Sequence, residues 1–167
     1  MKKTLLSLAI ASLAAGQSVC AAVEKVYNEP DSVYIFSYAH PEDEGRSGLK
    51  FAWSPDGDKW LSVSDGFAYL KCDFGRWGAE KRMIKPLLEK AEDGRWYCRW
   101  QLTPSGKVWG TSHSSDLLKW APQQYVNAEK PAVPRLVTAR QIVLDKDTLN
   151  GYMQKVPYVD IEQLIRF

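Results

Sequence analysis

A short motif occurs twice in this chain, and its repetition limits the folds that the chain can adopt. Residues 54–60 read SPDGDKW and residues 114–120 read SSDLLKW, so both copies have the form Ser-x-Asp-x-x-x-Trp. An Asp that follows a strand can accept hydrogen bonds from the backbone N–H groups of the next turn. The Trp four residues later can then cover the end of the sheet. We therefore expect the Asp and Trp of each copy to be structural: Asp56, Trp60, Asp116 and Trp120.

The motif lies inside a larger repeat of short strands. Alternation of apolar and polar residues predicts one series of strands over 33–39, 49–54 and 60–64, and another over 95–102, 107–114 and 119–125. Aligned on the two motifs, residues 33–64 match residues 95–125 as units. Self-similarity at about sixty residues, with about four strands in each unit, is typical of β-propeller blades.

The segment between the two units is expected to complete the first and open the second. SDGFAYLKCDFG, at its start, reads as the outer strand of the first blade. KRMIKPLLEK, near its end, reads as the inner strand of the second blade, because Pro86 in its middle argues against a helix.

From residue 126 the pattern changes. Residues 140–144 (RQIVL) predict a strand, and Asn150-Gly151 suits a hairpin turn. Asp160 is a possible cap for a short helix whose apolar face holds Ile161, Leu164 and Ile165. The expected fold is therefore all-β: a partial β-propeller of two four-stranded antiparallel blades within 23–125, and a mixed extension, 126–167, that ends in a short helix or starts a further domain.

The first 22 residues have the order of a secretory signal. Lys2 and Lys3 precede an apolar run that is too short to span a bilayer, and small residues follow it. A lipid anchor on Cys20 is the alternative, although Gln17-Ser18-Val19 forms a poor lipobox. No second long apolar run exists, so we expect a periplasmic or secreted protein without a membrane span.

Charge and composition exclude several classes of function. The formal net charge of +2 falls to 0 once Lys2 and Lys3 are removed, so no basic stripe is left for nucleic acid. Cys72 and Cys98 could form a disulfide in an oxidising compartment, but each could also be a free buried thiol. His40 and His113 are isolated and no metal-ligand spacing occurs, so neither a metal nor a cofactor is expected.

The run DGRWYCRWQLTPSGKVWGTSHSSDLLKWAPQQY (93–125) resembles a blade of the family 43-like glycoside hydrolases, five-bladed propellers that act on arabinose- and xylose-containing glycans. YIFSYAHPEDEGRSGLKFAWSPDGDKW (34–60) is similar to the preceding blade. The resemblance covers roughly residues 33–125, and it implies a carbohydrate partner and a role in polysaccharide degradation. Sialidases have a comparable corner that is usually one residue longer.

The chain departs from the family at the position of a catalytic acid. In the family an Arg-Asp-Pro motif places an Asp in the central funnel, whereas this chain has Ile84-Lys85-Pro86. A glycosidase needs two carboxylates, and an ammonium group can neither accept a proton nor attack the anomeric carbon. The remaining candidates, Glu29, Asp31 and Glu80, read as surface acids. No catalytic residue is therefore expected in this chain alone.

Two blades also leave a propeller ring open. The chain could be the N-terminal piece of a longer one, it could associate with other copies, or residues 126–167 could fold back as a cap.

The functional readings belong to different classes: a glycosidase-like protein in a fragmentary or non-catalytic form, a glycan-binding module, or a half-propeller without a ligand. Sugars pack their C–H faces on aromatic rings and need hydrogen-bond partners for their hydroxyls. The expected ligand-binding residues are Trp100, Trp77, Trp53, Tyr97 and His113.

Overall fold

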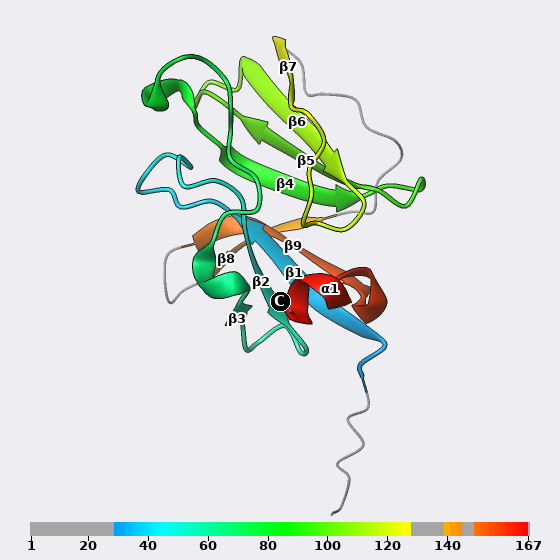
Figure 1. Ribbon diagram of the computed structural model, residues 1–167. Helices are drawn as coiled ribbons and strands as arrows, with labels where there is room; N and C mark the ends of the chain where they lie inside the picture. Colours follow the sequence, from blue (N-terminus) through cyan, green and yellow to red (C-terminus); the bar gives the residue numbers. More distant parts are fainter. Residues whose placement is uncertain (1–28, 128–138, 145–148, 167) are drawn as a thin grey trace, which may run out of the picture.

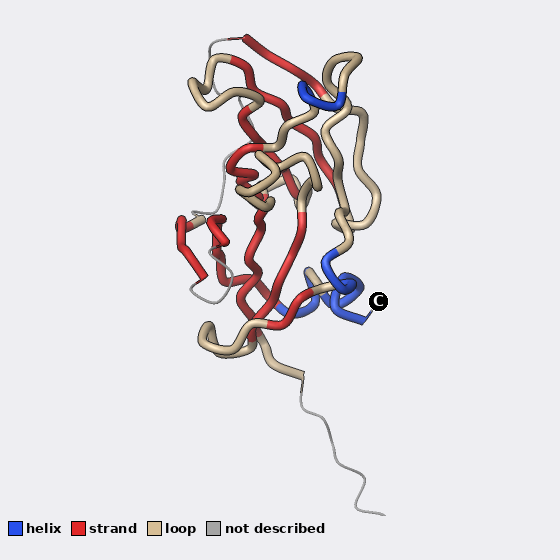
Figure 2. Tube along the Cα trace, turned by 90° about the vertical axis from the view of Figure 1, so that its left-hand side faces the viewer, coloured by secondary structure: helices blue, strands red, loops and turns tan. Residues whose placement is uncertain are grey.

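The computed structural model describes residues 29–127, 139–144 and 149–166, and this part of the chain is all-β with two antiparallel sheets (Figure 1). The orthogonal view in Figure 2 again places one sheet above the other, with the C-terminal helix beside the lower sheet. The expectation of an all-β fold with two antiparallel sheets and a short terminal helix is confirmed. The expected signal segment, residues 1–22, lies outside the described residues.

The first sheet has five strands in the order β3-β2-β1-β9-β8. Its strands are β1 (Ser32–Tyr38), β2 (Lys50–Ser54), β3 (Leu61–Ser62), β8 (Arg140–Leu144) and β9 (Leu149–Pro157). The prediction of four strands in this unit is wrong, because the C-terminal extension folds back and adds β9 and β8 beside β1. The expected strand at 140–144 is present as β8.

The second sheet is a simple meander in the order β4-β5-β6-β7. Its strands are β4 (Ile84–Lys90), β5 (Trp96–Gln101), β6 (Val108–Ser114) and β7 (Gln124–Asn127). The prediction of a strand around Pro86 is confirmed, and the proline sits where the register shifts between Ile84 and Leu87. A bulge tolerates a residue without an N–H group.

The two copies of the motif form the same corner. In the first, Asp56 Oδ1 accepts backbone hydrogen bonds from Asp58 at 2.9 Å and Lys59 at 3.0 Å, and Trp60 Nε1 donates to the Gly57 carbonyl at 3.1 Å.

In the second corner, Asp116 Oδ1 accepts from Leu118 at 2.9 Å and Lys119 at 2.8 Å, and Trp120 Nε1 donates to the Leu117 carbonyl at 3.2 Å. The same bonds therefore recur sixty residues apart.

The main core lies between the two sheets, where β4 packs against β1 and β9. Two polar side chains bridge this contact: Ser37 Oγ donates to the Pro86 carbonyl at 3.3 Å, and Gln154 Nε2 donates to the Leu88 carbonyl at 2.7 Å. Both side chains are buried. They satisfy carbonyl groups of β4, which is an edge strand of its own sheet.

Two local predictions are wrong. Residues 64–75 do not form an outer strand: the chain makes a 3-10 turn, η1 (Ser64–Gly66), and then only one β-bridge, between Leu49 and Leu70. Asn150-Gly151 is no turn, because both residues lie inside β9. A Cβ on Gly151 would come within 2.2 Å of the Ser37 carbonyl oxygen, so glycine allows the close approach of β9 to β1.

The end of the described chain forms the 3-10 turn η3 (Tyr158–Asp160) and the helix α1 (Glu162–Arg166). Ile161 and Leu164 are buried against the core, as the expected apolar face requires, and Ile165 is half-buried. Asp160 makes an ion pair with Lys90 at 2.5 Å. The turn η3, which follows β9 of the first sheet, is thus joined to β4 of the second sheet by this ion pair.

Cys72 and Cys98 are both buried and both free, so they are not bridged. Burial raises the pKa of the Cys98 thiol far above its ordinary value, which keeps it protonated and unreactive. Among the described residues, no helix has the length and apolar character needed to cross a membrane.

Candidate functional site

Tyr97 and His113 form a pair of rings on one face of the second sheet, opposite to the face that carries Trp96 and Cys98. They are partners in the β5–β6 register, and their ring centroids lie 5.6 Å apart. Their neighbours Trp96 and Cys98 point the other way, into the core. Both rings of the pair are half-buried, so each keeps an exposed portion that a ligand could contact.

The Tyr97 ring is held by Asp93, in the turn that precedes β5. The Tyr97 hydroxyl donates to Asp93 Oδ2 at 2.9 Å, while the Arg95 N–H donates to Asp93 Oδ1 at 3.0 Å. The Arg95 bond, helped by the Tyr97 bond, lowers the pKa of Asp93. Burial raises the pKa of Tyr97, and its bond to Asp93 adds to the rise. The charged carboxylate of Asp93 therefore holds the neutral Tyr97 ring in place through a hydrogen bond.

An ion pair lies next to these rings on the same face. Glu89, the register partner of Tyr97, pairs with Arg99, and both side chains are almost completely buried. Burial raises the pKa of the nearby Tyr152, and the Glu89 carboxylate adds to the rise. A buried ion pair fixes the positions of its two groups at a cost in desolvation.

A hollow of about 440 Å³ opens where β6 ends and the second corner begins. Its volume lies in the range of small-molecule sites. The hollow is lined by Arg95, His113, Ser114, Ser115, Lys119, Trp120 and Ala121. His113 therefore belongs both to the ring pair and to the hollow.

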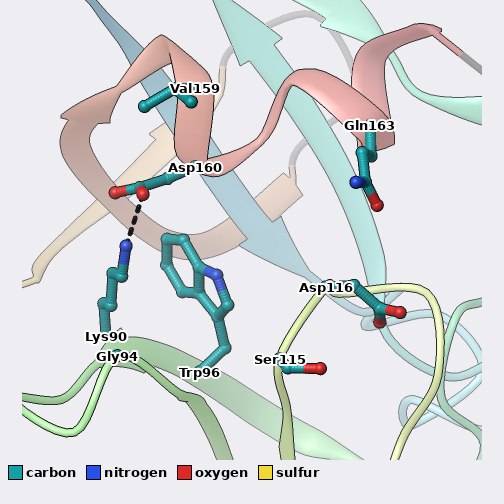
Figure 3. A pocket seen from close by; sticks show the side chains of 8 residues that line it. All are labelled: Lys90, Gly94, Trp96, Ser115, Asp116, Val159, Asp160 and Gln163. Atoms are coloured by element: carbon teal, nitrogen blue, oxygen red, sulfur yellow. Dashed lines mark ion pairs between the residues drawn. The ribbon is translucent and has the colours of Figure 1, made fainter.

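A second, smaller hollow of about 230 Å³ lies on the other side of the same corner, against η3 and α1 (Figure 3). Its two carboxylates are already occupied. Asp160 pairs with Lys90, as the dashed line shows, and Asp116 accepts the backbone bonds of the corner. The pKa of Asp116 is lowered, and the hydrogen bond from the Lys119 N–H is the largest cause of this shift. The hydrogen bonds from Leu118 and Ser114 lower the pKa further. These two acids are not poised for general acid–base catalysis.

Trp100 was expected to face a ligand, and this expectation is wrong. Its side chain is 0% exposed, and it packs over Gly110, where a Cβ would come within 2.3 Å of the indole. Gly110 is its register partner on β6. A glycine in the middle of a strand, opposite a large ring, is the sequence sign of such close packing.

Two other expected residues lie away from the ring pair. Trp53 is half-buried against the core between the sheets. Trp77 is 73% exposed in the loop before η2 (Gly78–Glu80), where Glu80 Oε2 accepts hydrogen bonds from the N–H groups of Arg76 at 3.0 Å and Trp77 at 3.2 Å. Of the five expected residues, the structure thus brings together only Tyr97 and His113.

Lys85 stands at the position where the resembled family has its catalytic Asp. Lys85 is exposed at the bulge of β4, with a φ of 50°, and lines neither hollow. Among the surface acids, Glu29 pairs with Arg166, and Glu80 caps its own loop.

Sequence reasoning missed the contribution of Arg95 and Lys119, and it treated Trp120 as structural only. A comparison of the two repeat units could have found the hollow. Trp53 and Leu61 of the first unit, which pair in register, correspond to His113 and Ala121 of the second.

Comparisons of the chain with family models, with curated proteins and with solved structures give no match.

Proposed function

We propose that this is an exported, carbohydrate-binding protein that resembles a furanosidase propeller and does not hydrolyse its ligand. The glycan would lie on the exposed face of the second sheet, against Tyr97 and His113, and extend into the hollow beside them. Aromatic rings offer flat faces to sugar C–H groups, and the imidazole and phenol offer hydrogen bonds to hydroxyls. The export part of the proposal rests on the sequence of residues 1–22.

The observation that carries this proposal is a difference between the two sheets. The position of Tyr97 and His113 is occupied in the first sheet by the register pair Ile35 and Trp53, which packs in the core between the sheets. One row further along, the first sheet has Ser37 and Phe51, whereas the second has Arg99 and Thr111.

At this row the first sheet has apolar side chains that pack in the core, whereas the second sheet has Tyr97 and His113, which both keep exposed portions. A face destined only to be covered by a further sheet would keep the apolar side chains. Polar groups next to aromatic rings, on a rigid sheet, are what a sugar-binding surface needs.

The lining of the two hollows supports the proposal that the ligand is bound without hydrolysis. No Asp or Glu is among the residues that line the larger hollow. The two acids of the smaller hollow are engaged in an ion pair and a turn. Retaining and inverting glycosidases both need a pair of available carboxyl groups across the scissile bond.

The test is calorimetric titration with arabino-, xylo- and pectic oligosaccharides, combined with a reducing-end assay of the same mixtures. We expect saturable binding to at least one glycan class, no release of reducing ends, and loss of binding in Tyr97→Ala and His113→Ala. Trp77→Ala is the control for an exposed aromatic residue elsewhere, and its affinity should be unchanged.

Three results would count against the proposal. If none of the glycans binds, the carbohydrate function is wrong. If Trp77→Ala abolishes binding while the other two variants keep it, the site is misplaced. Time-dependent hydrolysis by the purified protein would show an enzyme.

A further inference from the structure

We propose that the hollow beside the second corner recognises an acidic sugar, a residue that carries a carboxylate, within the bound glycan. This inference rests on the proposed function and assigns the substrate class to the same site. It is carried by the charges of the lining residues, the origin of the hollow in the repeat, and the fixed position of one indole ring.

The lining of the hollow has an excess of positive charge. Arg95 directly precedes β5 and Lys119 lies in the corner, both side chains are exposed, and no carboxylate is among the lining residues. Two acids adjoin the lining residues, and both accept hydrogen bonds: Asp93 from the Tyr97 hydroxyl and the Arg95 N–H, and Asp116 from the Lys119 N–H. A guanidinium beside an ammonium suits a carboxylate ligand, since the guanidinium can bind both of its oxygens.

The hollow is a feature of the second repeat unit. In the first unit the equivalent positions hold Trp53 and Leu61, and in the second they hold the smaller His113 and Ala121. The His113 carbonyl accepts a hydrogen bond from the Ala121 N–H at 2.8 Å, so the backbone pairing is kept while the side chains shrink. Loss of bulk at two neighbouring positions leaves space beside the corner.

Trp120 gives the hollow a fixed aromatic wall. Its Nε1–H donates to the Leu117 carbonyl at 3.2 Å, and its ring is half-buried against the core. An indole that is already ordered loses little entropy when a sugar packs on it. The arrangement therefore offers a wall for the sugar ring and cations for its carboxylate.

The repeat also supplies a matched control. Lys59 occupies the same place in the first corner as Lys119 in the second: both are exposed, and both donate their backbone N–H to the corner Asp, at 3.0 Å and 2.8 Å. Lys59 is not among the lining residues of the hollow. Each lysine side chain can be changed without loss of the backbone bond.

The experiment compares tetragalacturonate with the same tetrasaccharide after reduction of its carboxyl groups, by calorimetry at physiological ionic strength. We expect the acidic form to bind about tenfold more tightly. Lys119→Gln and Arg95→Gln should each weaken binding of the acidic form about three- to tenfold and leave binding of the reduced form unchanged. Lys59→Gln should change neither affinity.

The outcomes separate this inference from the proposed function. Equal binding of both forms would overturn the acidic class and leave carbohydrate binding in place. Equal weakening by Lys59→Gln and Lys119→Gln would show unspecific attraction to surface charge and also overturn it. Both proposals would be overturned if none of the ligands binds, that is, neither tetragalacturonate, nor its reduced form, nor the neutral glycans. Melting curves of each variant exclude a loss of fold as the cause.

Discussion

The hydroxyl of Ser114 donates a hydrogen bond to the carboxylate of Asp116 over 3.1 Å, and the same hydroxyl oxygen accepts the N–H of Leu117 at 2.8 Å. Ser54 makes both bonds in the first corner, to Asp56 at 3.0 Å and from Gly57 at 2.8 Å. The Ser and the Asp of each corner thus together accept hydrogen bonds from the backbone N–H groups of one turn, as capping residues do at the start of a helix.

Removal of the Asp116 carboxylate should therefore destabilise the protein. Asp116→Ala leaves the N–H groups of Leu118 and Lys119 without their acceptor, which should lower the free energy of unfolding by about 1–2 kcal/mol. Asp116→Asn keeps an acceptor oxygen, so its free energy of unfolding should fall less than that of Asp116→Ala. Urea denaturation of the three proteins measures the order. If Asn and Ala variants are equally destabilised, the backbone bonds are not what the carboxylate contributes.

The first corner should make the protein sensitive to acid in a defined range. Hydrogen bonds from the backbone of Lys59, then of Asp58, and from Ser54 lower the pKa of Asp56 from 3.8 to about 2. The folded state therefore binds this proton less readily than the unfolded state. The stability contributed by the charged carboxylate is present above pH 3.8 and is lost as the pH falls through about 2.

The check compares the wild type with Asp56→Asn at pH 5 and at pH 2. The urea midpoint of the wild type should fall more than that of the variant, because the variant has no such proton to bind. An identical fall in both proteins would mean that Asp56 contributes nothing to acid denaturation.

The corners could be predicted because their interactions are local. Every bond in them joins residues within three positions of each other, from Ser114 to Trp120. The strands on either side follow from alternation between strong turn sequences. Register pairs within each hairpin, such as Tyr97 with His113, follow from the same information.

The pairing of β9 with β1 could not be predicted, since it joins residues more than 100 positions apart. What allows it is a small side chain at Gly151 and a polar bridge from Gln154, and neither is visible as a pattern. The strand expected after residue 64 fails for a local reason. Asp65 and Gly66 both have left-handed backbone angles, with φ of 50° and 79°, and these end any extended run.

The hollow could be predicted only in part. His113 was predicted as a ligand-binding residue because its side chain can form hydrogen bonds with sugar hydroxyls. Arg95 and Lys119 were not predicted, because they line the same hollow from two different turns. Their proximity depends on how the corner folds back on the start of β5. Burial of Trp100, in contrast, could have been inferred from Gly110 opposite it on β6.

Leu117 occupies the position that Gly57 holds in the first corner, and two effects of opposite sign act there. Its backbone is left-handed, with a φ of 63°, while its side chain is 0% exposed in the core. Relief of the backbone strain by glycine should contribute about 1–2 kcal/mol. Loss of a buried leucine costs about 2–5 kcal/mol. Leu117→Gly should therefore be destabilised, with burial as the larger effect.

Leu117→Ala separates the two effects, because alanine loses most of the burial and keeps the strain. We expect the glycine variant to be at least as stable as the alanine variant in thermal denaturation. In an ordinary strand, alanine would be the more stable by about 0.5–1 kcal/mol. That ordinary order would contradict a left-handed backbone at this position.

Removal of one partner of the buried pair Glu89–Arg99 should strongly destabilise the protein, whereas replacement of both partners by apolar residues should destabilise it much less. Glu89→Leu leaves the guanidinium of Arg99 in a buried place without its carboxylate partner, and should lower the free energy of unfolding by about 3–5 kcal/mol. The double variant Glu89→Leu with Arg99→Met removes both charges and should recover most of that loss.

The matched control is Glu162→Gln, which weakens the partly exposed pair that Glu162 makes with Arg166 at 2.8 Å. Its effect should stay below about 0.5 kcal/mol, because solvent screens both groups. Urea denaturation of the four variants, including Arg99→Met alone, completes a double-mutant cycle for the buried pair. Additive losses in the double variant would show that the two side chains act independently, and the ion pair would then contribute nothing to the polar face beside Tyr97.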